Sequence, residues 1–358
     1  MSINFFNSKK FDLQLGYEAV NENGFSSASS GTFKNDDQQA EDVRARLENY
    51  DFFASAEAAI TDRFSIRPGF RYSFQSKFED QNAVSLGFRY LFDKGIEARA
   101  SIGKSYRTPN FDELYTYFVD SNHNLQGNKD LIPEQSMSYE ISLKKASFFE
   151  SGLKMVNNIS TSYINIDDRI SMVLAGTDPI LRYQYLNIDS YQIWNLATAH
   201  QVAYKNIEAK LGASLVGVSQ KIDTAALNAV SEDKFLYSFQ LNSNIAYNVP
   251  KWNTLFSIYY KYTGPFQQYV QTSDAQGDAL FVLSELEGYG MMDGSIRKSF
   301  FNNKFDVTLG SRNLLNVKTI QSTQAGGGTS VHDAASTSLL LGYGRSYFLK
   351  LTYNLNFN

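Results

Sequence analysis

Residues 346–357 read SYFLKLTYNLNF and decide the fold class, because large apolar side chains occupy every second position. In a β-strand successive side chains point to opposite faces, so alternate residues share one surface. One face of this stretch carries Tyr347, Leu349, Leu351, Tyr353, Leu355 and Phe357. The opposite face is mostly polar and carries Lys350, Thr352, Asn354 and Asn356. The stretch is therefore predicted to be a strand whose two faces meet different environments.

The same alternation recurs upstream, and the polar face is repeatedly the charged one. Residues 64–75 place Phe64 and Phe70 on one face and Arg67 and Arg71 on the other. Residues 84–92 and 304–315 follow the same pattern. The charged side chains expected on the polar face are Arg67, Arg71, Arg89 and Arg99, with Glu97 and Asp306. Charges on a shared inner surface need partners, which predicts ion pairs there or contacts with a domain inside.

The length of these segments favours a membrane barrel over a soluble sheet. Soluble antiparallel sheets also alternate, but their strands usually have about five or six residues. Strands of about ten residues or more can cross a bilayer at a tilt of about 45°. Aromatic residues gather at the segment ends, where an outer-membrane barrel has its interfacial girdles. The prediction is an all-β protein, a transmembrane antiparallel β-barrel.

Turn chemistry divides the chain into about 14 expected strands. Short connections such as 93–95 and 249–251 carry turn residues, whereas alternate connections such as 107–133 and 264–287 are long. Short turns on one side and long loops on the other are typical of outer-membrane barrels, whose long loops lie outside the cell. The expected strands are 11–18, 41–61, 63–75, 82–92, 96–106, 135–145, 153–174, 183–204, 207–219, 234–248, 253–263, 288–300, 304–315 and 345–357. Pro68 interrupts one of them, because proline cannot donate to a strand ladder.

Composition excludes several classes of protein. The 358 residues include 33 Lys and Arg against 37 Asp and Glu, and this slightly acidic balance argues against nucleic-acid binding. The absence of cysteine excludes disulfides, thiolate zinc sites and a cysteine nucleophile. No apolar run reaches the roughly 18 residues of a transmembrane helix, and the first residues lack the features of a signal peptide. If the protein is exported, its beginning is therefore expected to be missing.

Two motifs between the fifth and sixth expected strands resemble a known family. Residues 106–115 read YRTPNFDELY and residues 127–134 read GNKDLIPE. They resemble the paired loop motifs of TonB-dependent outer-membrane receptors. Residues 309–316 (LGSRNLLN) and 344–348 (GRSYF) resemble the late strands of the same family. The matching positions are Tyr106, Arg107, Pro109, Asn110, Glu113, Leu114, Tyr115, Gly127, Asn128, Leu131, Pro133 and Glu134. Thr108 and Lys129 depart from the pattern, and Asn358 follows the usual terminal aromatic residue.

The resemblance implies a larger architecture than these strands supply. Such receptors have a barrel of about 22 strands around a plug, so residues 1–358 are expected to be the C-terminal portion of the barrel, without the plug domain. The implied location is the outer membrane of a Gram-negative bacterium. The implied partners are outer-membrane lipid, a TonB-type energy-transducing complex reached through the missing plug, and the barrel-assembly machinery. That machinery is expected to read Tyr353, Leu355 and Phe357, and the arginines Arg67, Arg71, Arg89 and Arg99 are expected to face the plug.

The resemblance also implies a function, energy-dependent uptake of a scarce nutrient without bond chemistry and without a resident cofactor. The favoured cargo is an iron source, either haem or a ferric siderophore, with cobalamin or an oligosaccharide as alternatives. A passive porin remains a competing hypothesis, as does a barrel enzyme, although the three scattered histidines show no acid–base cluster.

Candidate ligand contacts lie in the expected outer loops. His123 sits between the paired motifs, where haem receptors of the family carry a ligating histidine, and a neutral imidazole suits haem iron. A local hydrogen-bonding role for His123 is the competing interpretation. Arg107 and Glu113 are expected to organise the base of the loop, since Pro109 ends the strand. The other candidates are Asn122, Asn124, Tyr115, Tyr117, Tyr269 and His332.

Overall fold

The computed structural model describes residues 2–8, 10–27, 29–30, 42–119, 123–176, 182–221, 223–224, 229–230, 234–273, 279–323 and 338–354. Most of them lie in one 18-stranded sheet, of which β3 (Ser29–Ser30), β8 (Tyr117–Val119) and β9 (Asn124–Gln126) are short loop strands. The other fifteen form an antiparallel meander. They are β1 (Ser2–Asn7), β2 (Phe11–Ser26), β4 (Val43–Ala59), β5 (Phe64–Gln75), β6 (Gln81–Phe92), β7 (Ile96–Arg107), β10 (Glu134–Phe148), β11 (Lys154–Gly176), β12 (Arg182–Tyr204), β13 (Ile207–Lys221), β16 (Leu236–Val249), β17 (Thr254–Thr263), β20 (Tyr289–Phe300), β21 (Phe305–Arg312) and β24 (Ser346–Tyr353).

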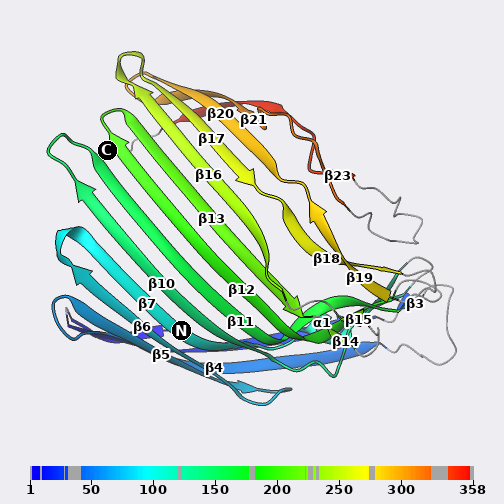
Figure 1. The fold of residues 1–358 in the computed structure, drawn as a ribbon. Helices are drawn as coiled ribbons and strands as arrows, with labels where there is room; N and C mark the ends of the chain where they lie inside the picture. The colour runs from blue at the N-terminus through cyan, green and yellow to red at the C-terminus, as the bar shows by residue number, and fades with distance from the viewer. Residues whose placement is uncertain are drawn as a thin grey trace.

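The meander forms a curved wall with two different ends (Figure 1). The short-turn end, at the upper left, has tight connections such as the 3-10 turns η1 (Asp93–Gly95) and η2 (Pro250–Trp252). The long-loop end, at the lower right, carries the single α-helix of the described residues, α1 (Phe111–Tyr115). Additional strands lie in its loops: β14 (Asp223–Thr224), β15 (Ala229–Val230), β18 (Phe266–Ser273), β19 (Ala279–Leu286), β22 (Thr319–Gln321) and β23 (Ser338–Leu340).

The wall is open, because its first and last strands are not paired with each other. Among the described residues β1 pairs only with β2, and β24 pairs only with β21. All pairings within the meander are antiparallel and join strands that follow one another along it. The all-β antiparallel fold predicted from the alternation is confirmed, although the described sheet does not close.

The structure corrects some of the expected boundaries. Each of the 14 expected strands is present, but β1 adds a strand that was not predicted. β2 continues to Ser26 because its ladder with β4 extends to the pair Ser26–Val43. The expected loop 264–287 contains the β18–β19 hairpin. Pro68 interrupts the β4–β5 ladder, which has no partners between the pairs Ser55–Gly69 and Ala58–Ile66.

The two faces of the wall follow the predicted alternation. Large apolar residues such as Phe70, Ile141 and Leu309 are exposed on one face, as expected for a surface that contacts lipid rather than water. The opposite face carries Arg67, Arg89 and the other charged residues of the same strands. No helix in the described part of the chain has the length and hydrophobicity needed to cross a membrane. The main cluster of buried apolar residues lies at the long-loop end, around α1.

Candidate functional site

The segment 107–134 connects β7 to β10 at the long-loop end, and its described residues, 107–119 and 123–134, are here called the loop platform. Its helix α1 begins after Asn110, which caps it: Asn110 Oδ1 accepts from Glu113 N at 2.9 Å, and a Glu113 carboxylate oxygen accepts from Asn110 N at 2.9 Å. This reciprocal capping box satisfies two backbone donors at the start of a helix. Pro109 lies just before the cap. Because proline disfavours helical backbone in the residue that precedes it, here Thr108, the helix cannot extend further toward β7. The motif residues therefore form a short, well-defined helix.

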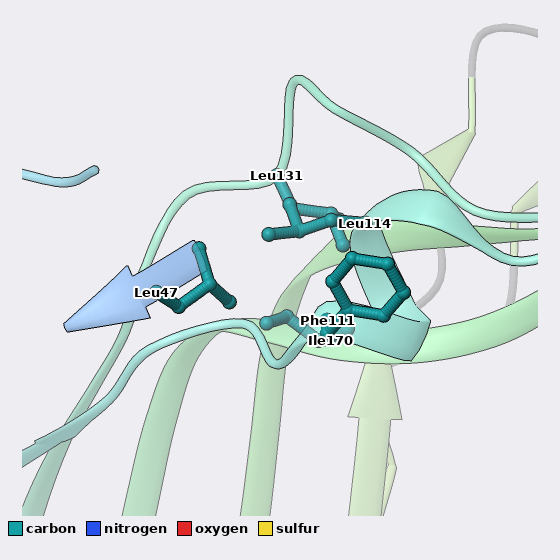
Figure 2. Close-up of a cluster of buried hydrophobic side chains, with 5 residues drawn as sticks. All are labelled: Leu47, Phe111, Leu114, Leu131 and Ile170. Atoms are coloured by element: carbon teal, nitrogen blue, oxygen red, sulfur yellow. The ribbon is translucent and has the colours of Figure 1, made fainter. Parts of the chain in front are cut away.

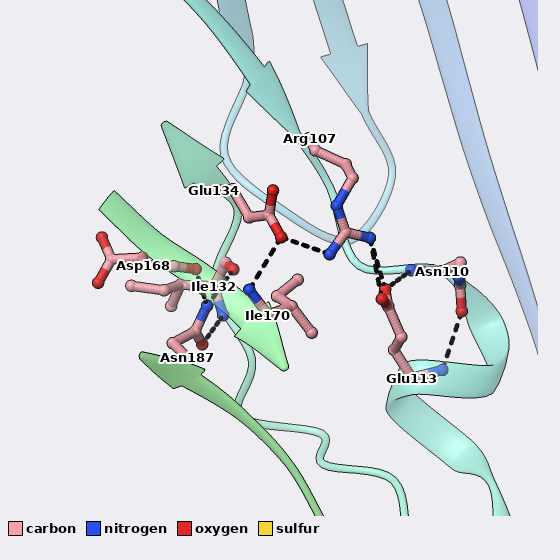
Figure 3. A network of polar contacts seen from close by, with 8 residues as sticks. All are labelled: Arg107, Asn110, Glu113, Ile132, Glu134, Asp168, Ile170 and Asn187. Atoms are coloured by element: carbon pink, nitrogen blue, oxygen red, sulfur yellow. Dashed lines mark hydrogen bonds and ion pairs between the residues drawn. The ribbon is translucent and has the colours of Figure 1, made fainter. Parts of the chain in front are cut away.

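Arg107 anchors this helix to the sheet through two carboxylates (Figure 3). Its Nη1 donates to both carboxylate oxygens of Glu113 at 2.9 Å, and its Nη2 donates to Glu134 Oε1 at 2.5 Å. The side chains of Glu113 and Glu134 are only 12% and 11% exposed, so each depends on Arg107 for its counter-charge. One guanidinium thus joins α1, the end of β7 and the start of β10.

The far side of the loop platform is fixed to β11 and β12. Glu134 Oε1 also accepts from the backbone N–H of Ile170 in β11 at 2.8 Å (Figure 3). Asn187 of β12 donates to the carbonyls of Ile132 and Asp168 at 2.9 and 2.6 Å and accepts from Ile132 N at 3.0 Å. Two of these hydrogen bonds hold the 128–133 segment through Ile132, and the third joins the same amide to β11.

An apolar core joins the two sides of the loop platform (Figure 2). Phe111 and Leu114 of α1 pack with Leu131 of the loop, Leu47 of β4 and Ile170 of β11. In the sheet, β4 and β11 are separated by β5, β6, β7 and β10. Side chains so far apart in a sheet can meet only across the inside of its curve. The polar face is therefore the concave face, and the core spans it.

A second set of backbone contacts follows the same path. β3, which follows β2 in the chain, pairs in parallel with β8; β8 pairs with β9; and β9 pairs in parallel with β12. Together with the meander from β2 to β12, and with the chain itself linking β2 to β3, these pairings make a closed ring at the long-loop end. Each loop strand has only two or three residues, so the ring depends on the core that it surrounds.

Two glycines permit this packing. A Cβ built on Gly127 would lie 2.6–2.7 Å from backbone atoms of Leu114 and Tyr115, and one on Gly24 would lie 2.1 Å from the Phe111 ring. Backbone atoms of a helix cannot move aside as a flexible side chain can. Gly127 in the second motif therefore allows the loop to lie directly against α1.

We expect Gly127→Ala to displace α1 and to destabilise the loop platform by about 1–3 kcal/mol, the usual cost of overpacking. The matched control is Gly152→Ala, because nothing lies within 4 Å of the Cβ at Gly152; its positive φ makes the control slightly strained rather than neutral. Hydrogen exchange of residues 110–119 should accelerate in Gly127→Ala and remain unchanged in Gly152→Ala. Equal protection in both variants would contradict the close packing.

Cationic and aromatic side chains meet on the exposed surface of the loop platform. The Lys77 ammonium lies 5.4 Å from the centre of the Tyr115 ring and 5.9 Å from that of Phe78. The Lys129 ammonium lies 6.0 Å from the same Tyr115 ring. Both lysines are exposed, whereas Tyr115 is half-buried against the core. Two cations on one aromatic ring can attract an anion and offer it a flat apolar surface.

The predicted loop histidine lies at the end of the β8–β9 hairpin. His123 is exposed and its ring lies 5.1 Å from that of Phe118, tilted by 39°. In the same hairpin Tyr117 pairs with Gln126, whose amide donates to Asn124 Oδ1 at 2.8 Å. The described residues include no group of three or more His, Asp or Glu side chains able to hold a metal ion. The role of His123 as an iron ligand therefore remains a prediction.

Several predicted site residues fall elsewhere. Asn122, His332, Leu355 and Phe357 lie outside the described residues. Tyr269 is in β18, a hairpin strand separate from the loop platform, and its side chain is also outside the description. Tyr353 ends β24, opposite Phe305. The structure thus brings Tyr115, Tyr117, His123 and Asn124 into one loop, and does not place Tyr269 among them.

The four predicted arginines line the concave face and have carboxylate partners in the wall itself. Arg67 pairs with Glu57, and Arg71 pairs with Asp51 at 3.2 Å. Arg89 and Arg99 both contact Glu97, at 3.0 and 2.6 Å. Arg67, Arg89 and Arg99 also line a cavity of about 510 Å³. The contact of these arginines with a plug stays a prediction.

Sequence reasoning did not find Asn187, Ile170, Leu47 or Lys77, which complete the site. Asn187 and Ile170 lie within long strands and carry no local signal. Leu47 gave a weak signal, since it is an apolar residue at a polar-face position of β4. These residues become part of the site only through the curvature of the sheet.

Comparisons with known proteins agree with this architecture. The family model described as TonB dependent receptor-like, beta-barrel, matches residues 2–314. A ferric enterobactin receptor from Pseudomonas aeruginosa aligns with a TM-score of 0.72 and 14% identity over 98% of this chain and 52% of that structure. The siderophore receptor PirA from Acinetobacter baumannii aligns with a TM-score of 0.70 and 15% identity over 98% of this chain and 53% of that structure.

A third similar structure is the FrpB iron transporter from Neisseria meningitidis, with a TM-score of 0.70 and 14% identity over 98% of this chain and 54% of that one. The chain thus spans about half the length of the solved structures that it matches. At these identities the likeness shows the fold. A comparison with curated protein sequences found no match.

Proposed function

Because this chain belongs to the TonB-dependent receptor β-barrel family of the Gram-negative outer membrane, we propose that it serves in energy-dependent uptake of an iron chelate. Members of this family are transport receptors. The observation that carries the proposal is the loop platform, a pre-ordered surface at the long-loop end with Lys77 and Lys129 beside the Tyr115 ring. Long loops of such barrels lie outside the cell, so this surface faces incoming ligand.

We also propose that the chain supplies one part of a larger barrel. An open sheet in a bilayer leaves unpaired backbone groups in hydrocarbon, each of which costs several kcal/mol. Within the described residues β1 and β24 each pair with one strand only, which supports completion by further strands, and the charged concave face supports a plug inside. The energy-transducing complex would act through that plug.

The chemistry of the loop platform favours an anionic, aromatic cargo. A ferric siderophore built from catecholates has negative charge and flat rings, which suit two ammonium groups around a tyrosine. Haem has the same two properties, through its propionates and its macrocycle, and adds an iron that an imidazole can ligate. The lysine pair fits both cargoes, while His123 would serve haem alone.

Binding to the intact receptor in detergent tests the proposal. Affinity for a ferric tricatecholate siderophore and for haemin is measured by fluorescence quenching in the parent, in the double variant Lys77→Gln/Lys129→Gln and in His123→Ala. We expect the double variant to bind the preferred chelate about tenfold more weakly, since each lysine contributes a charge-assisted contact. A matched control is Lys104→Gln, a lysine of β7 away from Tyr115.

The outcomes separate the two cargoes. Weaker haemin binding in His123→Ala, with siderophore binding intact, would identify haem, whereas unchanged haemin binding would falsify the ligand role of His123. If the double variant binds both chelates as the parent does, the proposed capture surface is wrong. Liposome swelling by the intact receptor without an energy source would instead indicate a passive pore.

A further inference from the structure

Three adjacent strands place polar side chains in one row on the apolar face of the wall, near its short-turn end. Lys145 of β10 is the cross-strand partner of Asn157 of β11, and Asn157 is the partner of His200 of β12. Directly opposed residues have Cβ atoms about 5 Å apart and point to the same side of a sheet. The three side chains therefore form one continuous patch, here called the polar row.

The polar row lies on the lipid-facing side. Lys144 is the cross-strand partner of Glu97 and lies on the concave face. Lys145, the next residue of β10, therefore points to the opposite, lipid-facing side. The neighbours of the polar row are apolar and exposed: Leu143 and Ile159 lie next to it on the long-loop side, and Leu211 is the partner of His200 in β13. On the opposite flank Lys145 is the partner of Ile96. A cation, an amide and an imidazole thus lie together on a mostly apolar surface, with Ser147 beside Lys145 on the turn side.

The contacts within the polar row leave part of its hydrogen-bonding capacity for a ligand. His200 Nδ1–H donates to Asn157 Oδ1 at 2.8 Å, which orients the amide and leaves the Asn157 amide nitrogen as a donor for another partner. Among the described residues Lys145 has no carboxylate within ion-pair distance. Polar side chains that face lipid are costly unless something pairs with them.

The short-turn end fixes which membrane surface is involved. In barrels of this kind the short turns face the periplasm, so this end meets the inner leaflet of the outer membrane. Phe92 and Tyr204, both exposed near the same end, provide the aromatic rings that favour such an interface. Lysine extends its charge toward the headgroups from this position while its methylenes remain in the apolar layer.

We propose that the polar row binds the phosphodiester of one inner-leaflet phospholipid. Lys145 supplies the counter-charge and the Asn157 amide nitrogen supplies a hydrogen-bond donor to the phosphate oxygens, while His200, whose Nδ1–H donates to Asn157 Oδ1, holds that amide in the orientation needed. The acyl chains lie along Leu143, Ile159 and Leu211. An anion site combined with an exposed apolar surface suits a lipid better than a free phosphate.

The test is lipid binding to the delipidated receptor. The receptor, purified in a maltoside detergent, is titrated with phosphatidylglycerol, and the bound lipids are counted by native mass spectrometry. Lys145→Gln is expected to lower the affinity of the tightest lipid about tenfold, as for the loss of one hydrogen bond to a charged group. His200→Leu is expected to lower it less, because it removes the group that orients the Asn157 amide and not a donor to the phosphate. Lys145→Arg should retain it, because the charge and donors remain.

Lys144→Gln is the matched control, since it removes the adjacent lysine from the same strand but from the concave face. Diacylglycerol with the same chains and inorganic phosphate at equal concentration are expected neither to occupy the site nor to displace the lipid. Heat-modifiability on gels confirms that each variant is folded. Equal binding by Lys145→Gln and Lys144→Gln would overturn the proposal, as would displacement of the lipid by inorganic phosphate.

Discussion

Arg107→Ala is expected to release the loop platform from the sheet. The substitution leaves Glu113 and Glu134 without their common counter-charge, and both carboxylates are largely buried. Breaking a buried ion pair costs about 3–5 kcal/mol. Because the Arg107 side chain is itself 42% exposed, we expect the substitution to lower the free energy of local opening of the loop platform by about 2–4 kcal/mol. Limited proteolysis of the receptor should then cut rapidly between residues 108 and 133, where the parent is resistant.

Arg67→Ala provides the comparison for this result. Arg67 also pairs with a glutamate on the concave face, but its side chain is 67% exposed, and pairs of that kind contribute about 1 kcal/mol or less. Its digestion pattern should match that of the parent. If Arg107→Ala is equally resistant, the two carboxylates have other partners and Arg107 does not hold the loop.

Leu114→Ala is expected to have an effect of similar size through packing. Leu114 is 1% exposed at the centre of the core that joins α1 to β4 and β11. Such truncations cost about 2–5 kcal/mol, depending on how far the cavity collapses. Hydrogen exchange should therefore increase in two segments far apart in sequence, around Leu47 and around Ile170.

Ile132→Ala is the control for this prediction, because Ile132 belongs to the same loop but is 49% exposed. It should leave exchange at both segments unchanged. Faster exchange confined to α1 in Leu114→Ala would show that the core does not connect β4 with β11.

Local patterns predicted most of the fold, and the reason is physical. Each strand has one face toward lipid and one toward polar surroundings, so its residues alternate wherever it crosses the membrane. The β18–β19 hairpin was missed because a long connection after Gly264 and Pro265 was interpreted as a loop, although its strands pair with each other and β19 bridges to Ser322. β1 was missed because a six-residue strand has too few alternations to stand out.

The candidate site was predictable only in part. The paired motifs located Arg107, Glu113 and Glu134, and the role expected for Arg107 and Glu113 at the loop base agrees with their contacts. Asn187 and Ile170 could not be predicted, since nothing in a long amphipathic strand distinguishes the residue that a distant loop will contact. Which strands approach one another across the concave face depends on the curvature of the whole sheet.

Because a closed ring surrounds the loop platform, the loops at the long-loop end of the wall are expected to differ in stiffness. From β2 to β12 the loop ends are fastened to one another by β3, β8, β9 and the core, so this arc moves as one rigid piece. The β18–β19 hairpin rises between β17 and β20 and is tied to the 321–323 segment by backbone hydrogen bonds from Thr323 to Glu285 and from Glu287 to Gln321. We therefore expect displacement of the rim to be resisted in the β2–β12 arc by a buried core together with strand pairing, and on the β18–β19 side by hydrogen bonds to the neighbouring loop.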